Sequence, residues 1–178
     1  MIYKMRNEMS SKELNNLIEY LKGNNIIIVE VGSYAGESAS VFAKSKRVKE
    51  IWCVDPWLPG WDDNAKASSS DYVEVEKAFD CVMKKYPNKI KKFKGTVQDF
   101  YDKHKTLKPD FVYIDAVHTY DACKKDIETS LKWKSLKWIG GHDYSKKWPG
   151  VMKIVDEKFK KPNKVFKETS WVINLKKR

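Results

Sequence analysis

Six consecutive residues at 26–31, with the sequence IIIVEV, constrain the fold of this chain more than any other feature. Five of the six are β-branched, and a run of this kind is typical of a strand that is buried on both faces of a parallel sheet. The run ends at Gly32, and a segment of small residues with helical character follows at 38–43. A second apolar run at 51–54 ends at Asp55. This order of strand, turn, helix and strand predicts an α/β protein.

The alternation of helices and strands continues along the chain. Ser10, with Glu13 three residues later, is predicted to cap the first helix. Apolar residues recur at helical spacing in segments that predict helices at 10–21, 71–86, 97–104, 120–133 and 151–159. Short apolar runs predict further strands around Phe93 and at 111–114, 136–139, 165–166 and 171–175. We therefore expect a Rossmann-like, doubly wound and mainly parallel sheet of seven strands, with helices on both faces.

The length of 178 residues suits one domain and is too short for two ordinary ones. We expect residues 1–178 to form this single domain, in which residues 1–25 contribute the N-terminal helix. The loop at 56–70 contains two prolines, a glycine and three serines and is longer than most connections. Loops of this length are commonly functional, so this segment is a candidate lid.

Several classes of protein are disfavoured by composition. No apolar stretch reaches the roughly 18 residues of a membrane span, and the N-terminus lacks the apolar core of a signal peptide. The three cysteines are widely spaced and form no C-x-x-C pair, which indicates reduced thiols. We therefore expect a soluble, cytoplasmic protein with no membrane partner.

The net charge of +11 is concentrated in the second half of the chain, which is rich in lysine. A basic face would suit nucleic acid, but the only arginines are Arg6, Arg47 and Arg178. We favour a solvated lysine-rich surface and expect nucleic-acid binding to be absent or non-specific. An enzyme that modifies nucleic acid, or a nucleic-acid-binding protein, remains the alternative function.

Polar residues and glycines follow the first two predicted strands, at the edge of the sheet where ligands bind in such folds. The first turn has the pattern E-x-G-x-x-x-G, from Glu30 through Gly32 to Gly36, and not the G-x-G-x-x-G of dinucleotide binders. Gly32 would let the backbone approach a ligand, and Glu30 could reach an ammonium or hydroxyl group. Asp55 is placed to accept hydrogen bonds from ribose hydroxyls. These residues fit a cationic ligand without phosphate.

Three later segments of the sequence combine glycines with polar residues in an order that resembles a known family. They are GTVQD at 95–99, DAVH at 115–118 and GGHDY at 140–144. In this order, and over residues 26–159, they resemble the O-methyltransferase group that includes catechol, macrocin and related sugar O-methyltransferases. The segment 171–175 is similar to the antiparallel last strand of that family.

The resemblance implies a class I methyltransferase that binds S-adenosylmethionine. It would place Glu30 and Gly32 at the methionine part, Asp55 at the ribose and Gln98 at the adenine. Gln98 taken alone would be interpreted as a helix-surface residue. The further residues expected at the cofactor are Ser33, Tyr34, Gly36, Ser38, Trp57 and Asp115.

The resemblance also implies a catalytic cluster. Asp115 and His118 would be catalytic, with His118 as general base, since histidine has an unperturbed pKa near 6.5. The alternative for His118 is a polar helix cap. Asp115, His142 and Asp143 would hold a divalent metal, but His142 stands where the family often has a carboxylate. Mg²⁺ prefers oxygen ligands, so another divalent metal suits this set better, and His142 could instead form only hydrogen bonds.

The acceptor is predicted to be a small hydroxylated molecule, either a sugar or an aromatic compound. Trp57, Trp61, Tyr144 and Trp148 could line the mouth of the pocket or pack in the core. No serine lies in a G-x-S-x-G context and no phosphate-binding loop is present, which disfavours hydrolases and kinases. A non-catalytic binding protein is disfavoured because both the cofactor turn and the polar cluster are present. A homodimer is compatible with the sequence.

Overall fold

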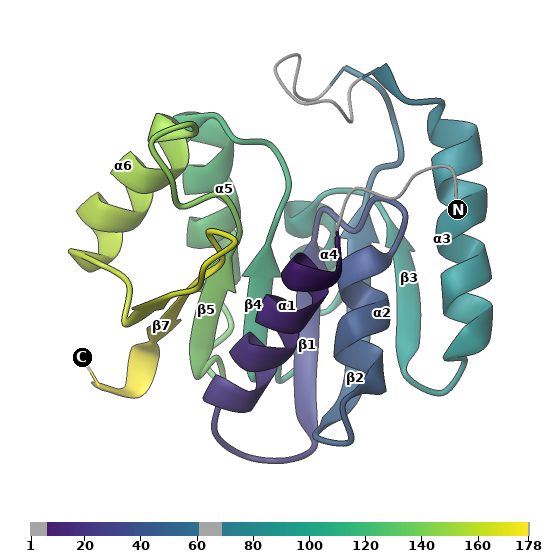
Figure 1. Cartoon of the computed structure of the whole chain (residues 1–178), viewed down its shortest axis with the longest axis horizontal. Helices are drawn as coiled ribbons and strands as arrows, with labels where there is room; N and C mark the ends of the chain where they lie inside the picture. Colours follow the sequence, from purple (N-terminus) through teal and green to yellow (C-terminus); the bar gives the residue numbers. More distant parts are fainter. Residues whose placement is uncertain (1–6, 61–68, 178) are drawn as a thin grey trace.

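The computed structural model describes residues 7–60 and 69–177 and shows a seven-stranded sheet in the order β3-β2-β1-β4-β5-β7-β6 (Figure 1). The strands are β1 (Ile26–Val31), β2 (Val48–Asp55), β3 (Ile90–Lys94), β4 (Phe111–Ile114), β5 (Trp138–Gly141), β6 (Lys164–Val165) and β7 (Trp171–Asn174). The first five strands pair in parallel, whereas β7 runs antiparallel to both β5 and β6. The predicted Rossmann-like sheet with an antiparallel last strand is therefore confirmed.

In the described part of the chain, six α-helices cover the two faces of the sheet (Figure 1). They are α1 (Glu8–Tyr20), α2 (Glu37–Lys44), α3 (Tyr72–Lys85), α4 (Val97–Lys103), α5 (Tyr120–Ser130) and α6 (Pro149–Phe159). The helices α1, α2 and α3 pack in one apolar core, and α4, α5 and α6 pack in the other. In β1, Ile28 faces the first core and Val29 the second. Both faces of this strand are buried, which explains why every residue in it except Glu30 is apolar.

The sheet order reverses between β1 and β4, because the chain moves outward through β2 and β3 before it returns to the other side of β1. In open α/β sheets, ligands bind at such a point, outside the carboxyl ends of the strands. Val31 of β1 pairs with Val54 of β2 and with Ile114 of β4, so these three strands end at the same edge. The fold thus brings the segments after them together.

Several predicted boundaries were wrong by a few residues. The first helix begins at Glu8, not at Ser10, because the Asn7 side chain caps it by accepting a hydrogen bond from the Ser10 backbone amide (2.8 Å). The Ser10 hydroxyl instead donates to Glu168 (2.8 Å), a partner that is distant in sequence. The fifth strand begins at Trp138, two residues later than predicted, and α5 ends at Ser130, three residues earlier.

Of the candidate lid at 56–70, residues 61–68 lie outside the described part of the chain, and Trp61 lies there with them. Within the described residues, no helix combines the length and the apolar composition that a membrane crossing requires.

Candidate functional site

A cavity of about 510 Å³ lies at the carboxyl ends of the parallel strands. Residues at or just after the ends of β1 to β5 line it, among them Ser33, Asp55, Gly95, Asp115 and His142. Its volume falls within the range of roughly 300–1,000 Å³ that is typical of small-molecule sites. The cavity is therefore the candidate binding site for a small molecule.

Gly32 lines the cavity, but its main constraint comes from the neighbouring strand. Its φ is +85°, and a Cβ atom there would lie 2.1 Å from the carbonyl oxygen of Asp115. Gly32 is thus required where the turn after β1 touches the backbone after β4. Gly36 has a φ of +80° at the start of α2, faces Phe79 and Val82, and does not line the cavity. Ligand contact was the expectation for both glycines, and the structure gives each a packing reason.

Glu30 is completely buried in β1 and is not among the residues that line the cavity. Burial raises the pKa of Glu30 to about 7, against the lowering influence of the Ser38 and Ser33 hydroxyls and the Cys53 thiol. The thiol of Cys53 donates to Glu30 Oε2 (3.5 Å). Ser33 and Ser38 do line the cavity, so they stand between Glu30 and any ligand. The expected direct contact of Glu30 with a ligand is not supported by this arrangement.

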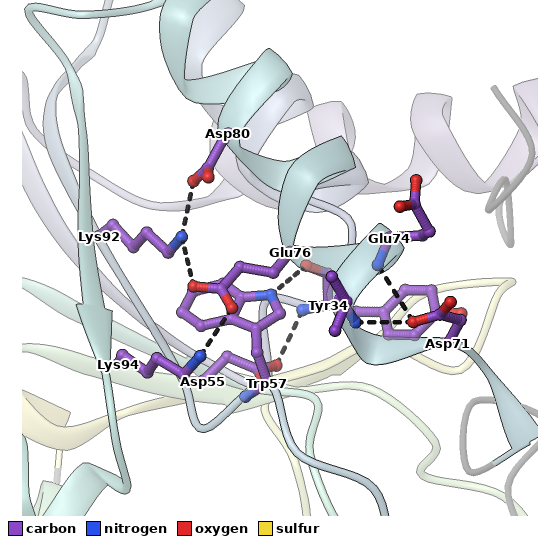
Figure 2. Close-up of polar contacts among 10 residues, drawn as sticks. Tyr34, Asp55, Trp57, Asp71, Glu74, Glu76, Asp80, Lys92 and Lys94 are labelled. Atoms are coloured by element: carbon purple, nitrogen blue, oxygen red, sulfur yellow. Dashed lines mark hydrogen bonds and ion pairs between the residues drawn. The ribbon is translucent and has the colours of Figure 1, made fainter.

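Asp55 lines the cavity and is held by two backbone amides (Figure 2). Its Oδ2 accepts from the Tyr34 amide (2.9 Å) and its Oδ1 from the Trp57 amide (2.7 Å). Burial raises the pKa of Asp55, and these backbone hydrogen bonds oppose that shift. The carboxylate is fixed at the end of β2, and each oxygen retains acceptor capacity for a ligand hydroxyl.

Trp57 is buried in the core and does not line the cavity. Its indole donates to the Tyr34 carbonyl (2.9 Å), and its ring packs against Phe79 with a centroid distance of 4.8 Å. Lys92 covers the ring and pairs with Glu76 at 2.7 Å (Figure 2). Trp57 therefore anchors the start of the loop, and its predicted place at the cofactor or at the mouth of the pocket is not supported.

Gln98 lines the cavity at the start of α4, but its amide is already engaged. Its Nε2 donates to Asp102 (2.7 Å), and its Oε1 accepts from Lys132 (2.8 Å) and Thr129 (3.2 Å). The helix-surface interpretation thus describes the hydrogen bonding of the Gln98 amide group, although the residue itself lines the cavity.

His118, His142, Asp115 and Asp143 all line one part of the cavity. Asp143 Oδ2 lies 2.7 Å from His118 Nε2 and 3.1 Å from His142 Nδ1, and Asp115 Oδ1 lies 4.0 Å from His142 Nδ1. Burial would raise the pKa of Asp143, but the hydrogen bonds from His118 and His142 outweigh it and hold the pKa well below its usual range. The ring of His118 also stacks on Trp148, with centroids 4.1 Å apart. The carboxylate of Asp143 is thus ionised beside two oriented imidazoles.

Three of these residues form a potential metal site. One ligand atom each from Asp115, His142 and Asp143 can be chosen so that all three lie within 4.8 Å of one another. One imidazole nitrogen and two carboxylate oxygens form a donor set that suits transition metals better than Mg²⁺. The residues present therefore fit a divalent ion.

Several cavity residues were not predicted from the sequence. Tyr72 and Asp126 line the cavity from α3 and α5, and Ser10 and Glu168 close it from the two ends of the chain. The sequence does not mark Ser10 or Glu168 as cavity residues, because only tertiary packing brings them to the cavity. Of the aromatic residues expected at the mouth, Trp148 lines the cavity, whereas Tyr144 does not.

Solved structures share this fold. The chain resembles CalS11, a TDP-rhamnose 3'-O-methyltransferase of calicheamicin biosynthesis, with a TM-score of 0.60 and 13% identity, covering 93% of this chain and 77% of that chain. It also resembles an O-methyltransferase from Bacillus cereus in complex with S-adenosylhomocysteine, with a TM-score of 0.60 and 12% identity, covering 94% of this chain and 80% of that chain. A search of curated proteins finds no match. Residues 29–144, more than half of the chain, match the family described as a methyltransferase domain, and the chain therefore belongs to this family of S-adenosylmethionine-dependent methyltransferases.

Proposed function

We propose that this chain transfers a methyl group from S-adenosylmethionine to a hydroxyl group of a small acceptor, with His118 as the general base. The observation that carries the proposal is the 2.7 Å contact between His118 Nε2 and Asp143 Oδ2 in the wall of the cavity. A paired and oriented imidazole of this kind is the usual device for removing a proton from a hydroxyl group.

The cavity offers a suitable setting for the cofactor. Ser33 lines the cavity in the turn after β1, and its hydroxyl offers a donor and acceptor lone pairs to a bound molecule. Asp55 would accept hydrogen bonds from the ribose hydroxyls. When bound, S-adenosylmethionine supplies a methyl group on a sulfonium, and the carbon–sulfur bond breaks with its electron pair left on sulfur.

The residues around His118 suit proton transfer. In the tautomer that donates from Nε2 to Asp143, the lone pair of the ring lies on Nδ1. That nitrogen would take the proton of the acceptor hydroxyl as its oxygen attacks the methyl carbon. Asp143 would stabilise the imidazolium that forms, and stacking on Trp148 keeps the ring in one plane. No covalent intermediate with the protein is needed, so the chain contributes alignment and deprotonation.

Asp115, His142 and Asp143 would hold a divalent ion beside the acceptor. Such an ion would orient the acceptor oxygens and lower the pKa of the reacting hydroxyl group. Asp143 would then serve both the ion and His118, which makes it the residue that couples the two.

A small acceptor is supported by the size of the cavity and by its aromatic lining, which includes Tyr34, Tyr72 and Trp148. Aromatic rings bind the apolar faces of sugars and planar compounds. The fold neighbours that are named as O-methyltransferases support a hydroxyl acceptor.

The test is a methyl-transfer assay with labelled S-adenosylmethionine over panels of sugar nucleotides and catechols, with Mg²⁺, Mn²⁺ or a chelator. For the acceptor that reacts, His118→Ala should lower turnover by roughly 10²- to 10⁴-fold, whereas the affinity for S-adenosylhomocysteine should change less than about twofold. Near-normal turnover of His118→Ala at saturating substrates would show that His118 is not the general base. Activity that survives the chelator would show that the reaction needs no divalent metal.

A further inference from the structure

Asp126 is a cavity residue to which neither the fold nor the proposed chemistry gives a role. It lies on the second turn of α5 and lines the cavity. Within the described part of the chain, its carboxyl group has no hydrogen bond and no ion pair. Burial raises the pKa of Asp126 to about 7, and the nearby charge of Lys125 opposes the shift only in part. Asp126 is half-buried in the wall of the cavity, so its carboxyl group is available to a ligand that fills the cavity.

The place of Asp126 along α5 shows which part of the cavity it serves. Ala122, one turn earlier, also lines the cavity, and Thr129, one turn later, donates to Gln98 of α4. Residues three and four positions apart share one face of a helix, so Asp126 lies between these two contacts. Asp126 therefore belongs to the end of the cavity that α4 and α5 form together.

That end of the cavity lies beyond the ribose position. Asp55 stands at the end of β2, and Gly95, Thr96 and Val97 line the cavity where β3 passes into α4. A nucleoside whose ribose meets Asp55 would place its base against this β3 to α4 segment and thus toward α5. Adenine presents an amine donor beside a ring-nitrogen acceptor, and a protonated carboxyl group offers the matching acceptor and donor.

Gln98 also lines this end of the cavity, but its amide group is already hydrogen-bonded within the protein. Both ends of that amide already bond Asp102, Lys132 and Thr129. Contact with adenine through this amide would require those bonds to break, whereas Asp126 has none to lose.

We propose that Asp126 is the residue that recognises the adenine ring, by accepting a hydrogen bond from its exocyclic amine and pairing with the adjacent ring nitrogen. The proposal rests on the assignment of S-adenosylmethionine as the cofactor. It makes Asp126 a specificity-determining residue of the cofactor site.

Calorimetric titration with two ligands tests this role directly. S-adenosylhomocysteine carries the amine, and S-inosylhomocysteine has a carbonyl oxygen in its place. The wild-type protein should prefer S-adenosylhomocysteine by about tenfold or more, the effect of one lost hydrogen bond together with an unmatched polar group. Asp126→Ala should lose most of this preference. Asp126→Asn should keep it, because an amide also offers one acceptor and one donor.

Asp121→Ala is the matched control, since Asp121 is an exposed carboxylate on the same helix that does not line the cavity. It should retain the wild-type preference, and melting curves should show that all the variants fold. An unchanged preference in Asp126→Ala, with wild-type affinity for S-adenosylhomocysteine, would overturn the role of Asp126 and leave the proposed function standing. Failure of the wild-type protein to bind S-adenosylhomocysteine would overturn the cofactor assignment and this inference with it.

Discussion

Glu30 and Gly32 occupy the end of β1 and the turn after it for reasons of burial and packing, whereas the sequence suggested that they contact a ligand. Both belong to the E-x-G turn that suggested contact with a cofactor. In the structure Glu30 is completely buried and does not line the cavity. Position 32 requires a glycine because the turn lies against the backbone of Asp115. The E-x-G pattern identifies the turn, but the sequence alone does not show which parts of the protein contact it.

The raised pKa of the buried Glu30 carboxyl group leads us to expect an unusual dependence of stability on pH. Its pKa rises from 4.5 in the unfolded chain to about 7 in the folded protein, so the folded state binds the proton more tightly. The free energy of unfolding should therefore fall as pH rises from about 5 to 7.5, by an amount on the order of 3 kcal/mol from this group.

Glu30→Gln removes this titration with little change in shape. Urea unfolding at pH 5 and pH 7.5 should show a smaller difference for the variant than for the wild-type protein. A residual slope is expected, because the pKa of Asp126 is also raised to about 7. Asp143 does not contribute to this slope, because its pKa is lowered and its stabilisation of the fold is lost only as pH falls below about 4. Equal differences in Glu30→Gln and wild-type protein would contradict the burial argument.

At the scale of elements, the GTVQD segment at 95–99 has a structural role that its resemblance did not reveal. Thr96 and Asp99 form a capping box at the start of α4. The Thr96 hydroxyl accepts from the Asp99 amide (3.2 Å), and Asp99 Oδ2 accepts from the Thr96 amide (3.1 Å). The cap fixes the helix whose first turn lines the cavity.

Thr96→Ala should lower the free energy of unfolding by about 1 kcal/mol, the usual value of a side-chain N-cap. Thr106→Ala is the matched control, because Thr106 is exposed and lies outside any helix. Chemical denaturation of the two variants measures the difference. Equal stabilities would show that the capping box contributes nothing to the fold.

The order of the helices and strands could be predicted because each has its own apolar periodicity. The ends of the elements could not, since they depend on partners such as Asn7 for α1. The same division holds for the site. Asp55, Asp115 and His118 follow strands and could be predicted to meet at one edge of the sheet. Asp126 lies inside a helix, and only the packing of α5 beside α4 turns it into the cavity.

On the scale of the whole molecule, the net charge is +11, and several of the basic side chains are engaged in local pairs. Lys91 pairs with Glu50 (2.9 Å), and Lys92 and Lys94 both pair with Glu76 (2.7 Å each). The Arg47 guanidinium donates to backbone carbonyls at the end of α1, such as that of Ile18 (2.9 Å). Arg47 is thus committed to the fold.

We therefore expect any binding of nucleic acid to be weak, indifferent to sequence and steeply dependent on salt, because scattered lysines attract phosphates without reading bases. Fluorescence anisotropy with DNA and RNA oligonucleotides at 50 and 300 mM salt measures this. Sequence-specific binding that persists at the higher salt concentration would favour a nucleic-acid substrate over a small acceptor.

The central claim is that the cavity at the carboxyl ends of β1 to β5 binds S-adenosylmethionine. Isothermal titration of the wild-type protein with S-adenosylmethionine and S-adenosylhomocysteine tests it most directly, with Asp55→Ala as the variant that removes the proposed ribose contact. We expect one site per chain for both ligands and an affinity at least about tenfold weaker in Asp55→Ala, because a charged hydrogen bond is lost. Absence of binding of either ligand to the folded wild-type protein at millimolar concentration would contradict the account.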